Sequence, residues 1–191
     1  MKSETRKEEI IATAAKLFKE KGYSAVTMRD LASELGIKAA SLYNHIASKQ
    51  DILKAIIISI AEAFTKGIKL VIASDISSIE KLKQVVELHV NITSYNTNGM
   101  ASLNNDWMHL EDQLEYYLTL RSNYENEIRC IIENGISEGE IVDENVEVIL
   151  FSMLSTLRSL YLWIPKKEDL NPKQLAKSLS QILIKGISQT S

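Results

Sequence analysis

The sequence is short of the residues that define several protein classes. A single cysteine, Cys130, excludes an intramolecular disulfide framework. No continuous apolar run reaches the ~20 residues that a membrane-spanning helix needs, and the charged start MKSETRKEEI lacks the apolar segment of a secretory signal. We therefore expect a cytoplasmic protein without a membrane partner.

Residues that interrupt helices are also scarce, since the 191 residues include only seven glycines and two prolines. Hydrophobic residues make up 45% and charged residues 25% of the chain, a balance that argues against disorder. We expect helices joined by short connections, in one domain with a substantial core or in a small domain joined to a larger one.

Patterns for metal binding or catalysis are missing as well. The three histidines, His45, His89 and His109, share no i, i+4 ligand spacing, and Cys130 has no CxxC partner. No phosphate-binding glycine loop or nucleophile elbow is present. We expect no cofactor, no metal and no enzyme activity. Cys130, next to two isoleucines, is expected to be a buried apolar residue.

Charge is unevenly distributed along the chain. Residues 1–50 hold nine Lys/Arg and six Asp/Glu, whereas the remainder holds 13 and 19, and the whole chain carries −3. A basic amino end on an acidic body indicates that the amino end is the part that meets a polyanion.

Apolar residues recur with a helical period from the start of the chain. Residues 4–21 form an amphipathic pattern, and Gly22 supplies the left-handed residue that commonly ends a helix. Thr27 and Asp30 have the spacing of a capping box, which predicts a short helix ending at Leu35. A second short helix is expected over residues 38–46.

The helical pattern continues to the end of the chain, without an alternating strand pattern or an internal repeat. Further helices are expected over residues 48–73, 77–95, 103–110, 114–138, 145–163 and 172–187. The clearest turn is predicted at Asn96–Gly99. The β-branched residues 56–58 lie inside a long helical period, so we expect burial to override their propensity. The expected fold class is all-α.

Residues 27–46 satisfy the geometry of a helix-turn-helix. Ala32 supplies the small residue needed where two short helices cross, and Gly36 can adopt the positive φ that a tight turn requires. The apolar residues spaced to lock the crossing angle are Leu31, Leu35, Ile37 and Leu42. The second helix has a polar face that can lie in the DNA major groove, with side chains at base edges.

The region from Lys7 to Ala55 resembles the DNA-binding domain of TetR-family regulators. The residues that carry the resemblance are Ala15–Phe18, Gly22-Tyr23, Thr27–Ala32, Gly36-Ile37, Ser41–Ile46 and Ser48–Leu53. Ile46 departs from the phenylalanine that is more usual there, which should affect packing only. The resemblance implies a homodimeric all-α repressor of double-stranded, palindromic operator DNA. Its N-terminal three-helix DNA-binding domain would occupy residues 1–50, and its helical ligand-binding and dimerisation domain residues 51–191.

The resemblance also implies which side chains meet DNA. The phosphate contacts would be Thr27, Tyr43, His45 and Lys49; the base-facing residues would be Lys38, Ala39, Ser41 and Asn44; Arg29 is included in the DNA-binding set. Two alternatives stay open: Tyr43 packs on its own domain, or Lys49 is a solvated lysine, although its place at a helix start favours a phosphate.

Aromatic and methionine residues gather on the middle helices. The predicted effector-binding residues are Phe64, Tyr95, Met100, Trp107, Met108, Tyr117, Arg121 and Tyr124. The alternative is that this group is simply core, but its polar members favour a partly polar cavity. The stretches around Leu120–Tyr124, Gly139–Ile141 and Tyr161–Trp163 resemble fatty-acid-metabolism regulators, which implies an acyl-CoA or fatty-acid effector. Arg121 would hold its anionic head group.

The last two helices are predicted to form the dimer surface. The predicted interface residues are Leu150, Leu154, Leu157, Leu175, Leu179 and Ile182. The serines between them would allow close helix approach. The alternative is that both helices complete the core of the monomer, but TetR-like chains usually pair through their two last helices.

Three functions remain open at this point. An effector-responsive repressor explains the helix-turn-helix, the charge asymmetry and the second domain together, and it is our prediction. A DNA-binding regulator controlled by a partner protein explains the first two features equally well. A ligand-binding or catalytic helical protein with a vestigial DNA-binding domain explains only the second domain.

Overall fold

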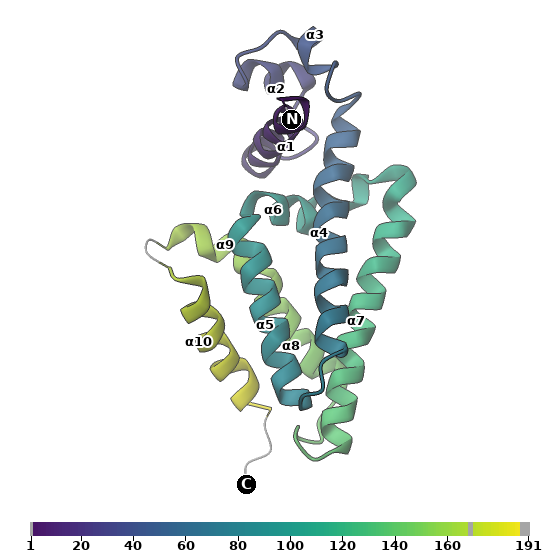
Figure 1. The fold of residues 1–191 in the computed structure, drawn as a ribbon, viewed down its shortest axis with the longest axis vertical. Helices are drawn as coiled ribbons and strands as arrows, with labels where there is room; N and C mark the ends of the chain where they lie inside the picture. Colours follow the sequence, from purple (N-terminus) through teal and green to yellow (C-terminus); the bar gives the residue numbers. More distant parts are fainter. Residues whose placement is uncertain (1, 168–169, 188–191) are drawn as a thin grey trace. The chain divides into compact units, whose positions relative to one another are not determined.

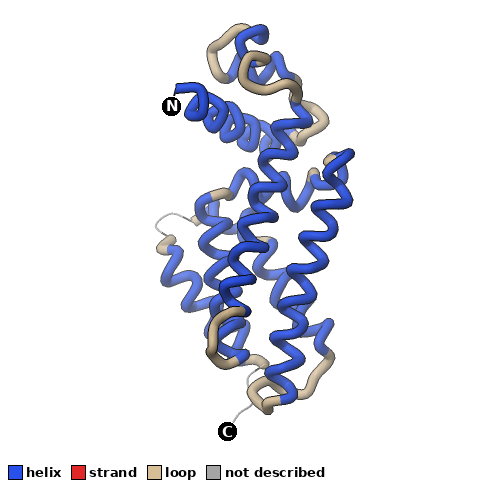
Figure 2. Tube along the Cα trace, turned by 45° about the vertical axis from the view of Figure 1, so that its right-hand side comes forward, coloured by secondary structure: helices blue, strands red, loops and turns tan. Residues whose placement is uncertain are grey.

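The computed structural model describes residues 2–167 and 170–187 (Figure 1). Within these residues the regular elements are α-helices and single turns of 3-10 helix, and none is a strand (Figure 2). The predicted all-α fold class is confirmed.

The chain folds into two compact units. The first comprises the residues up to Ala61 together with Asn96–Leu118, and the second comprises Glu62–Tyr95 and the residues from Thr119 onward. Two long helices, α4 (Lys49–Ile72) and α7 (Leu114–Ser137), contribute residues to both units. The functional division at residue 50 stays a prediction.

The first unit begins with three helices and the start of α4. These helices are α1 (Lys2–Lys21), α2 (Met28–Glu34) and α3 (Ala39–Leu42). The predicted capping box is confirmed: the Asp30 N–H donates to the Thr27 hydroxyl at 3.2 Å, and the Thr27 N–H donates to the Asp30 carboxylate at 2.8 Å. Gly36 has φ +65°, as the tight turn between the two helices requires.

The rest of the first unit corrects one sequence prediction. It contains α6 (Thr97–Asn105), the 3-10 turns η1 (Trp107–His109) and η2 (Glu111–Gln113), and the start of α7. The turn predicted at Asn96–Gly99 is wrong, because α6 begins there. Gly99 is buried, and a Cβ on it would lie 2.7 Å from Cδ1 of Ile60. This glycine therefore permits close helix packing and does not mark a turn.

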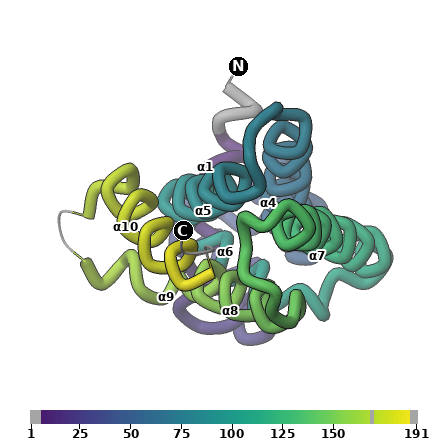
Figure 3. Tube along the Cα trace, turned by 90° about the horizontal axis from the view of Figure 1, so that it is seen from below, coloured from purple at the N-terminus to yellow at the C-terminus, as the bar shows by residue number. Residues whose placement is uncertain are grey.

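The second unit is a bundle of helices seen end-on in Figure 3. Besides parts of α4 and α7 it contains α5 (Ser78–Tyr95), α8 (Val146–Arg158), α9 (Leu160–Trp163), the 3-10 turn η3 (Ile164–Lys166) and α10 (Pro172–Lys185). The helix predicted over residues 145–163 is interrupted at Ser159. Helix α10 packs against α5 (Figure 3).

The segment Val146–Lys166 is unusually apolar for a surface element. Its length is sufficient for a membrane span, and an 18-residue window within it has a mean hydropathy of 1.4 and is 39% buried. Polar residues interrupt the apolar ones in this segment, so a search for a continuous apolar run did not find it. The segment is divided between α8, α9 and η3, and the buried face of α8 supplies leucines to the core of the second unit.

Candidate DNA interface and buried polar cluster

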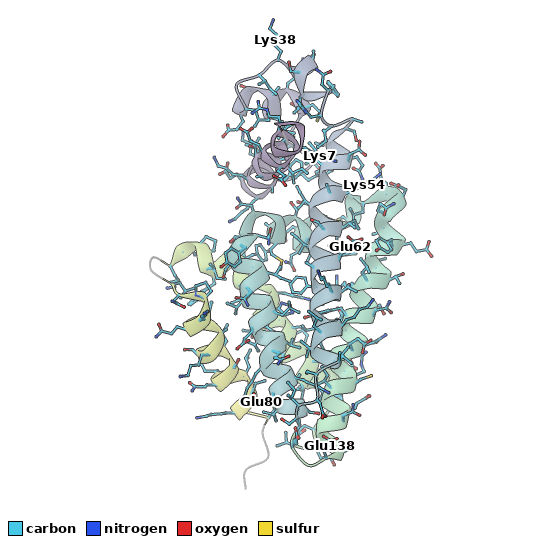
Figure 4. All side chains as sticks on the ribbon, viewed as in Figure 1. Lys7, Lys38, Lys54, Glu62, Glu80 and Glu138 are labelled. Atoms are coloured by element: carbon cyan, nitrogen blue, oxygen red, sulfur yellow. The ribbon has the colours of Figure 1, made fainter. Side chains whose placement is uncertain are left out.

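The second helix of the helix-turn-helix is shorter than predicted but presents the predicted polar face. Helix α3 ends at Leu42, and residues 43–45 form a turn. Leu42 and Ile46 are buried beneath this segment. The predicted base-facing residues Lys38, Ser41 and Asn44 are exposed, whereas Ala39 is half-buried. Figure 4 shows Lys38 projecting outward from the tip of its unit.

The other predicted DNA contacts on this motif differ in their surroundings. Tyr43 is 54% exposed, and its contact with a phosphate stays a prediction. His45 is half-buried, and Arg29 is exposed. The exposed Thr27 hydroxyl donates to the Asp30 carboxylate at 2.6 Å, and this hydrogen bond lowers the pKa of Asp30. The cap is therefore formed before any contact with DNA.

Lys49 has a structural role that the sequence did not reveal. Its Nζ donates to the carbonyls of Tyr23 at 2.9 Å and Val26 at 2.8 Å, and it lies 4.2 Å from the centroid of the Tyr23 ring. Burial lowers the pKa of this lysine. Since an ammonium group has three donors, one remains for a phosphate oxygen. Lys49 thus closes the loop that precedes α2.

Residues far along the sequence support the same loop. The Tyr23 hydroxyl donates to Gln50 Oε1 at 2.5 Å, and the Gln50 amide donates to the carbonyl of His109. The rings of Tyr23 and His109 stack with centroids 5.2 Å apart. Burial raises the pKa of Asp106, which precedes this turn. Residues 106–109 therefore belong structurally to the first unit, together with the helix-turn-helix, a relation that no local sequence pattern indicated.

The eight predicted effector-binding residues are divided between the two units. Met100, Trp107 and Tyr117 lie in the first unit, where the rings of Trp107 and Tyr117 are 6.1 Å apart. Tyr95 and Met108 are exposed, Tyr95 to 84%. The remaining three, Phe64, Arg121 and Tyr124, lie in the second unit.

The second unit contains a buried polar cluster formed by Phe64, His89 and Tyr124. The Tyr124 hydroxyl lies 2.9 Å from Nε2 of His89, and the ring centroids of Phe64 and His89 are 4.6 Å apart. The rings of Phe64 and Tyr124 meet at 5.5 Å. Sequence reasoning missed His89 because a lone histidine on an apolar helix face gives no signal of its own.

Burial determines the protonation states of His89 and Tyr124. It lowers the pKa of His89 to about 3, with a smaller effect from the positive charge of Arg158, and it raises the pKa of Tyr124. Both side chains are therefore neutral near pH 7.

The charged groups of this region pair with one another. Glu125 Oε1 accepts from Arg121 Nε at 3.1 Å and from Arg158 Nη2 at 2.5 Å. Burial raises the pKa of Glu125, but the hydrogen bonds and charges of the two arginines outweigh it and leave that pKa lowered. Arg121, predicted to hold an anionic head group, is thus half-buried in an ion pair.

The predicted dimer residues are mostly internal to the monomer. Leu150, Leu154, Leu157 and Leu175 are buried, which favours the alternative that they complete the core. Leu179 is half-buried, and Ile182 is 72% exposed. The opposite face of α8 carries the exposed residues Val148, Phe151, Ser152, Ser155, Thr156 and Ser159. Glu147, one helical turn before Phe151, is also exposed on this helix, and it pairs with Arg129.

Cys130 corrects another prediction. It is exposed and not buried, because the buried face of α7 runs through Tyr124, Ile128, Ile131 and Ile132 and leaves Cys130 on the other side. Among the residues that the structure describes, no group of His, Cys, Asp and Glu has the arrangement of a metal site.

Comparison with known proteins adds family relationships to this geometry. Residues 10–56 match a family model described as "Bacterial regulatory proteins, tetR family", and residues 75–187 match "Tetracyclin repressor-like, C-terminal domain". Along 186 residues the chain is 24% identical to the HTH-type transcriptional repressor KstR2 of Rhodococcus jostii (strain RHA1), covering 96% of this chain and 91% of the relative.

A shorter match concentrates on the amino-terminal region. Over 46 residues, 24% of this chain and 25% of the relative, the chain is 50% identical to IcaR of Staphylococcus aureus (strain Newman), the negative transcriptional regulator of the biofilm operon icaADBC. These relatives are transcriptional regulators, so the prediction that the chain is not an enzyme is confirmed.

Solved structures establish the fold. The ketosteroid transcriptional regulator KstR2 of Mycobacterium tuberculosis matches with a TM-score of 0.90 at 21% identity, covering 97% of this chain and 96% of that one. The fatty acid degradation regulator FadR from Bacillus halodurans matches with a TM-score of 0.69 at 18% identity, covering 94% and 95%.

Proposed function

Because this chain belongs to the TetR family of bacterial regulatory proteins, whose members are DNA-binding transcriptional repressors, we propose that it binds a palindromic operator as a homodimer. We further propose that a small amphipathic molecule, held in the second unit, releases the operator. The protein would act in the cytoplasm, where its operator DNA lies.

One observation carries the DNA-binding assignment. Buried Leu42 and Ile46 anchor a segment whose outer side chains, Lys38, Ser41 and Asn44, are exposed and polar. These residue types hydrogen-bond base edges in the major groove. A selection of binding sequences from random duplex DNA tests the proposal, and we expect two inverted half-sites. Their centres should be one DNA turn apart, about 34–36 Å, or a multiple of it. Recovery of no common sequence would contradict operator binding.

The exposed apolar side chains of α8 support dimerisation. Phe151 is 71% exposed and Val148 is also exposed, with small hydroxyl residues between and beyond them. A groove of about 240 Å³ between α8 and the end of α10 is lined by Val148, Ile149, Ser152 and Leu183, among others. Large exposed apolar side chains beside a groove are typical of subunit contacts. A second copy, related by a twofold axis, is the occupant that we propose.

Light scattering tests the dimer with two matched variants. Phe151→Glu should yield monomers, because the charge would be desolvated without a partner. Leu70→Glu, at an exposed leucine of α4, is the control and should stay dimeric. A Phe151→Glu variant that remained dimeric would place the interface elsewhere.

The effector proposal has support from the fold and from the relatives. The second unit combines the apolar surroundings of Phe64 with hydrogen-bonding groups on His89 and Tyr124, which is the composition of small-molecule sites. An acyl-CoA or fatty acid is our first candidate. A ketone-bearing ring compound is the second, because one structural relative is a ketosteroid transcriptional regulator. Helix α4, which contributes to both units, is the proposed link to the DNA-binding unit.

Operator release is the measurement that separates these candidates. Acyl-CoAs, free fatty acids of graded length and ketosteroids are titrated against the labelled operator complex. We expect at least one class to weaken operator affinity by about 5- to 150-fold, the usual range of allosteric coupling. If no small molecule acts while a protein from the source cell does, the regulator is controlled by a partner protein.

A further inference from the structure

His89 has one ring nitrogen without a hydrogen-bond partner among the described residues. Its Nε2 meets the Tyr124 hydroxyl at 2.9 Å, whereas its Nδ1 is buried and unpartnered. The whole residue is only 2% exposed. Buried polar atoms are nearly always hydrogen-bonded, so an unsatisfied nitrogen at this depth requires an explanation.

The hydrogen bond with Tyr124 determines what Nδ1 can bind. In one arrangement the Tyr124 hydroxyl donates to Nε2, and Nδ1 then carries the ring proton and is a donor. In the other, Nε2–H donates to the Tyr124 oxygen, and Nδ1 is then an acceptor. Rotation of the hydroxyl permits either arrangement. The pair can thus meet a ketone oxygen, which only accepts, or a hydroxyl group, which does both.

The surroundings of His89 select for an uncharged group. The ring stays neutral at physiological pH because burial and the charge of Arg158 disfavour its protonated form. Arg158 itself bonds Glu125, which also pairs with Arg121. On the other side the Phe64 ring lies 4.6 Å away, tilted by 45°. A carboxylate placed at Nδ1 would lose its hydration without gaining a free cation, which is costly.

We propose that Nδ1 of His89 is the hydrogen-bonding contact for an uncharged oxygen, a ketone or hydroxyl, on an otherwise apolar effector. Tyr124 positions the imidazole through the hydrogen bond at Nε2, and the tautomer follows the group that binds Nδ1. The inference rests on the proposed effector-responsive function and narrows its ligand class. An anionic end, if the effector has one, lies away from His89, and the group bound here is a neutral oxygen.

The test uses the full-length protein with ¹⁵N-labelled histidine. The ring-nitrogen resonances of His89 are followed by NMR while 2-decanone, 1-decanol, cyclododecanone or sodium decanoate is added. Because His45 and His109 lie in the first unit, their resonances are internal controls. We expect at least one of the three neutral probes to shift the Nδ1 resonance of His89 selectively. Decanoate should bind at least tenfold more weakly than 1-decanol.

Variants separate the polar contact from packing. His89→Phe should weaken binding of the responding probe by about tenfold, since the replacement fills the space without a hydrogen bond. Tyr124→Phe should weaken it less and, by removing the hydrogen bond at Nε2, should change the tautomer populations of the His89 ring. If either variant unfolds, the measurement on the unmodified protein still decides. Tighter binding of decanoate, or an Nδ1 resonance that no neutral probe shifts, would overturn the inference, as would a crystal structure with only an ordered water at Nδ1 in the presence of the probes.

A parallel operator titration keeps the two proposals apart. If the ligand-free protein binds its operator and His89 does not respond, the neutral-oxygen inference fails alone. If His89 responds but no specific operator is found, the proposed function fails while the binding site remains.

Discussion

The helix-turn-helix and the core of the second unit place their polar side chains in opposite environments. Lys38, Ser41 and Asn44 are exposed above buried apolar residues, whereas His89 and Tyr124 lie inside the protein. Exposed polar groups cost little in the free protein and act only when DNA arrives. Buried ones must be satisfied by the fold or by a ligand. Changes to the first set should therefore alter binding alone, and changes to the second should alter stability as well.

Neighbouring residues of α3 give the largest expected contrast. Leu42→Ala removes a fully buried side chain and should lower the free energy of unfolding by about 2–5 kcal/mol. Ser41→Ala, at an exposed position, should change stability by less than about 0.5 kcal/mol yet weaken operator binding. Urea unfolding and operator titration measure the two effects. Equal stability losses in both variants would show that the exposed face contributes to the fold.

The buried histidine should make the second unit sensitive to acid. The pKa of His89 falls from 6.5 to about 3 on folding, so the unfolded chain binds the proton more readily. Its contribution to stability is present above pH 6.5 and is lost as the pH falls toward 3. At pH 5 the loss is about 2 kcal/mol. The charged or titratable groups of neighbouring helices that act on this site are Tyr124 and Arg158.

Chemical unfolding at pH 7 and pH 5 measures this loss. His89→Phe is the control, since it keeps the volume and removes the titrating group. The variant should lose about 2 kcal/mol less stability between the two pH values than the unmodified protein does. Parallel pH dependences in the two proteins would mean that His89 is not neutralised by folding.

A substitution at the exposed residue Asn44 tests whether the exposed polar side chains act only in DNA binding. Asn44→Ala should leave stability nearly unchanged and cost about 1–3 kcal/mol in operator affinity, because an amide side chain can bond a base edge. The loss should be confined to operators with the preferred base at one position of each half-site. Binding measured against a library of single-base operator variants shows this directly. A uniform loss across the library would assign Asn44 to the phosphate backbone.

The same contrast explains which features were predictable from sequence. The Thr27–Asp30 capping box and the turn at Gly36 depend on residues within one helical turn, so local chemistry was sufficient. Gly99 was misread because its partner, Ile60, is distant in sequence. His89 was missed for the same reason, as Tyr124 lies 35 residues away.

The buried leucines of α8 show another limit of sequence patterns. A stripe of leucines identifies an apolar helix face but does not say what covers it. In the structure, other residues of the same chain bury Leu150, Leu154 and Leu157. The exposed face with Phe151 and several serines was less conspicuous, because its few large apolar residues do not form a strong apolar period.

Lys49 gives the smallest expected effect and combines both environments in one side chain. Two of its three donors hold the carbonyls of Tyr23 and Val26, and the third is predicted to meet a phosphate. Lys49→Ala should therefore lower stability by about 1 kcal/mol and weaken binding to all DNA sequences alike. The dependence of log affinity on log salt should become shallower by about one for each subunit that loses the contact. Lys54→Ala is the matched control, because Lys54 lies on the same helix but pairs with Asp112. If Lys49→Ala loses stability but shows the same salt dependence as the control, Lys49 does not contact a phosphate. Its role would then be only to hold the loop before α2.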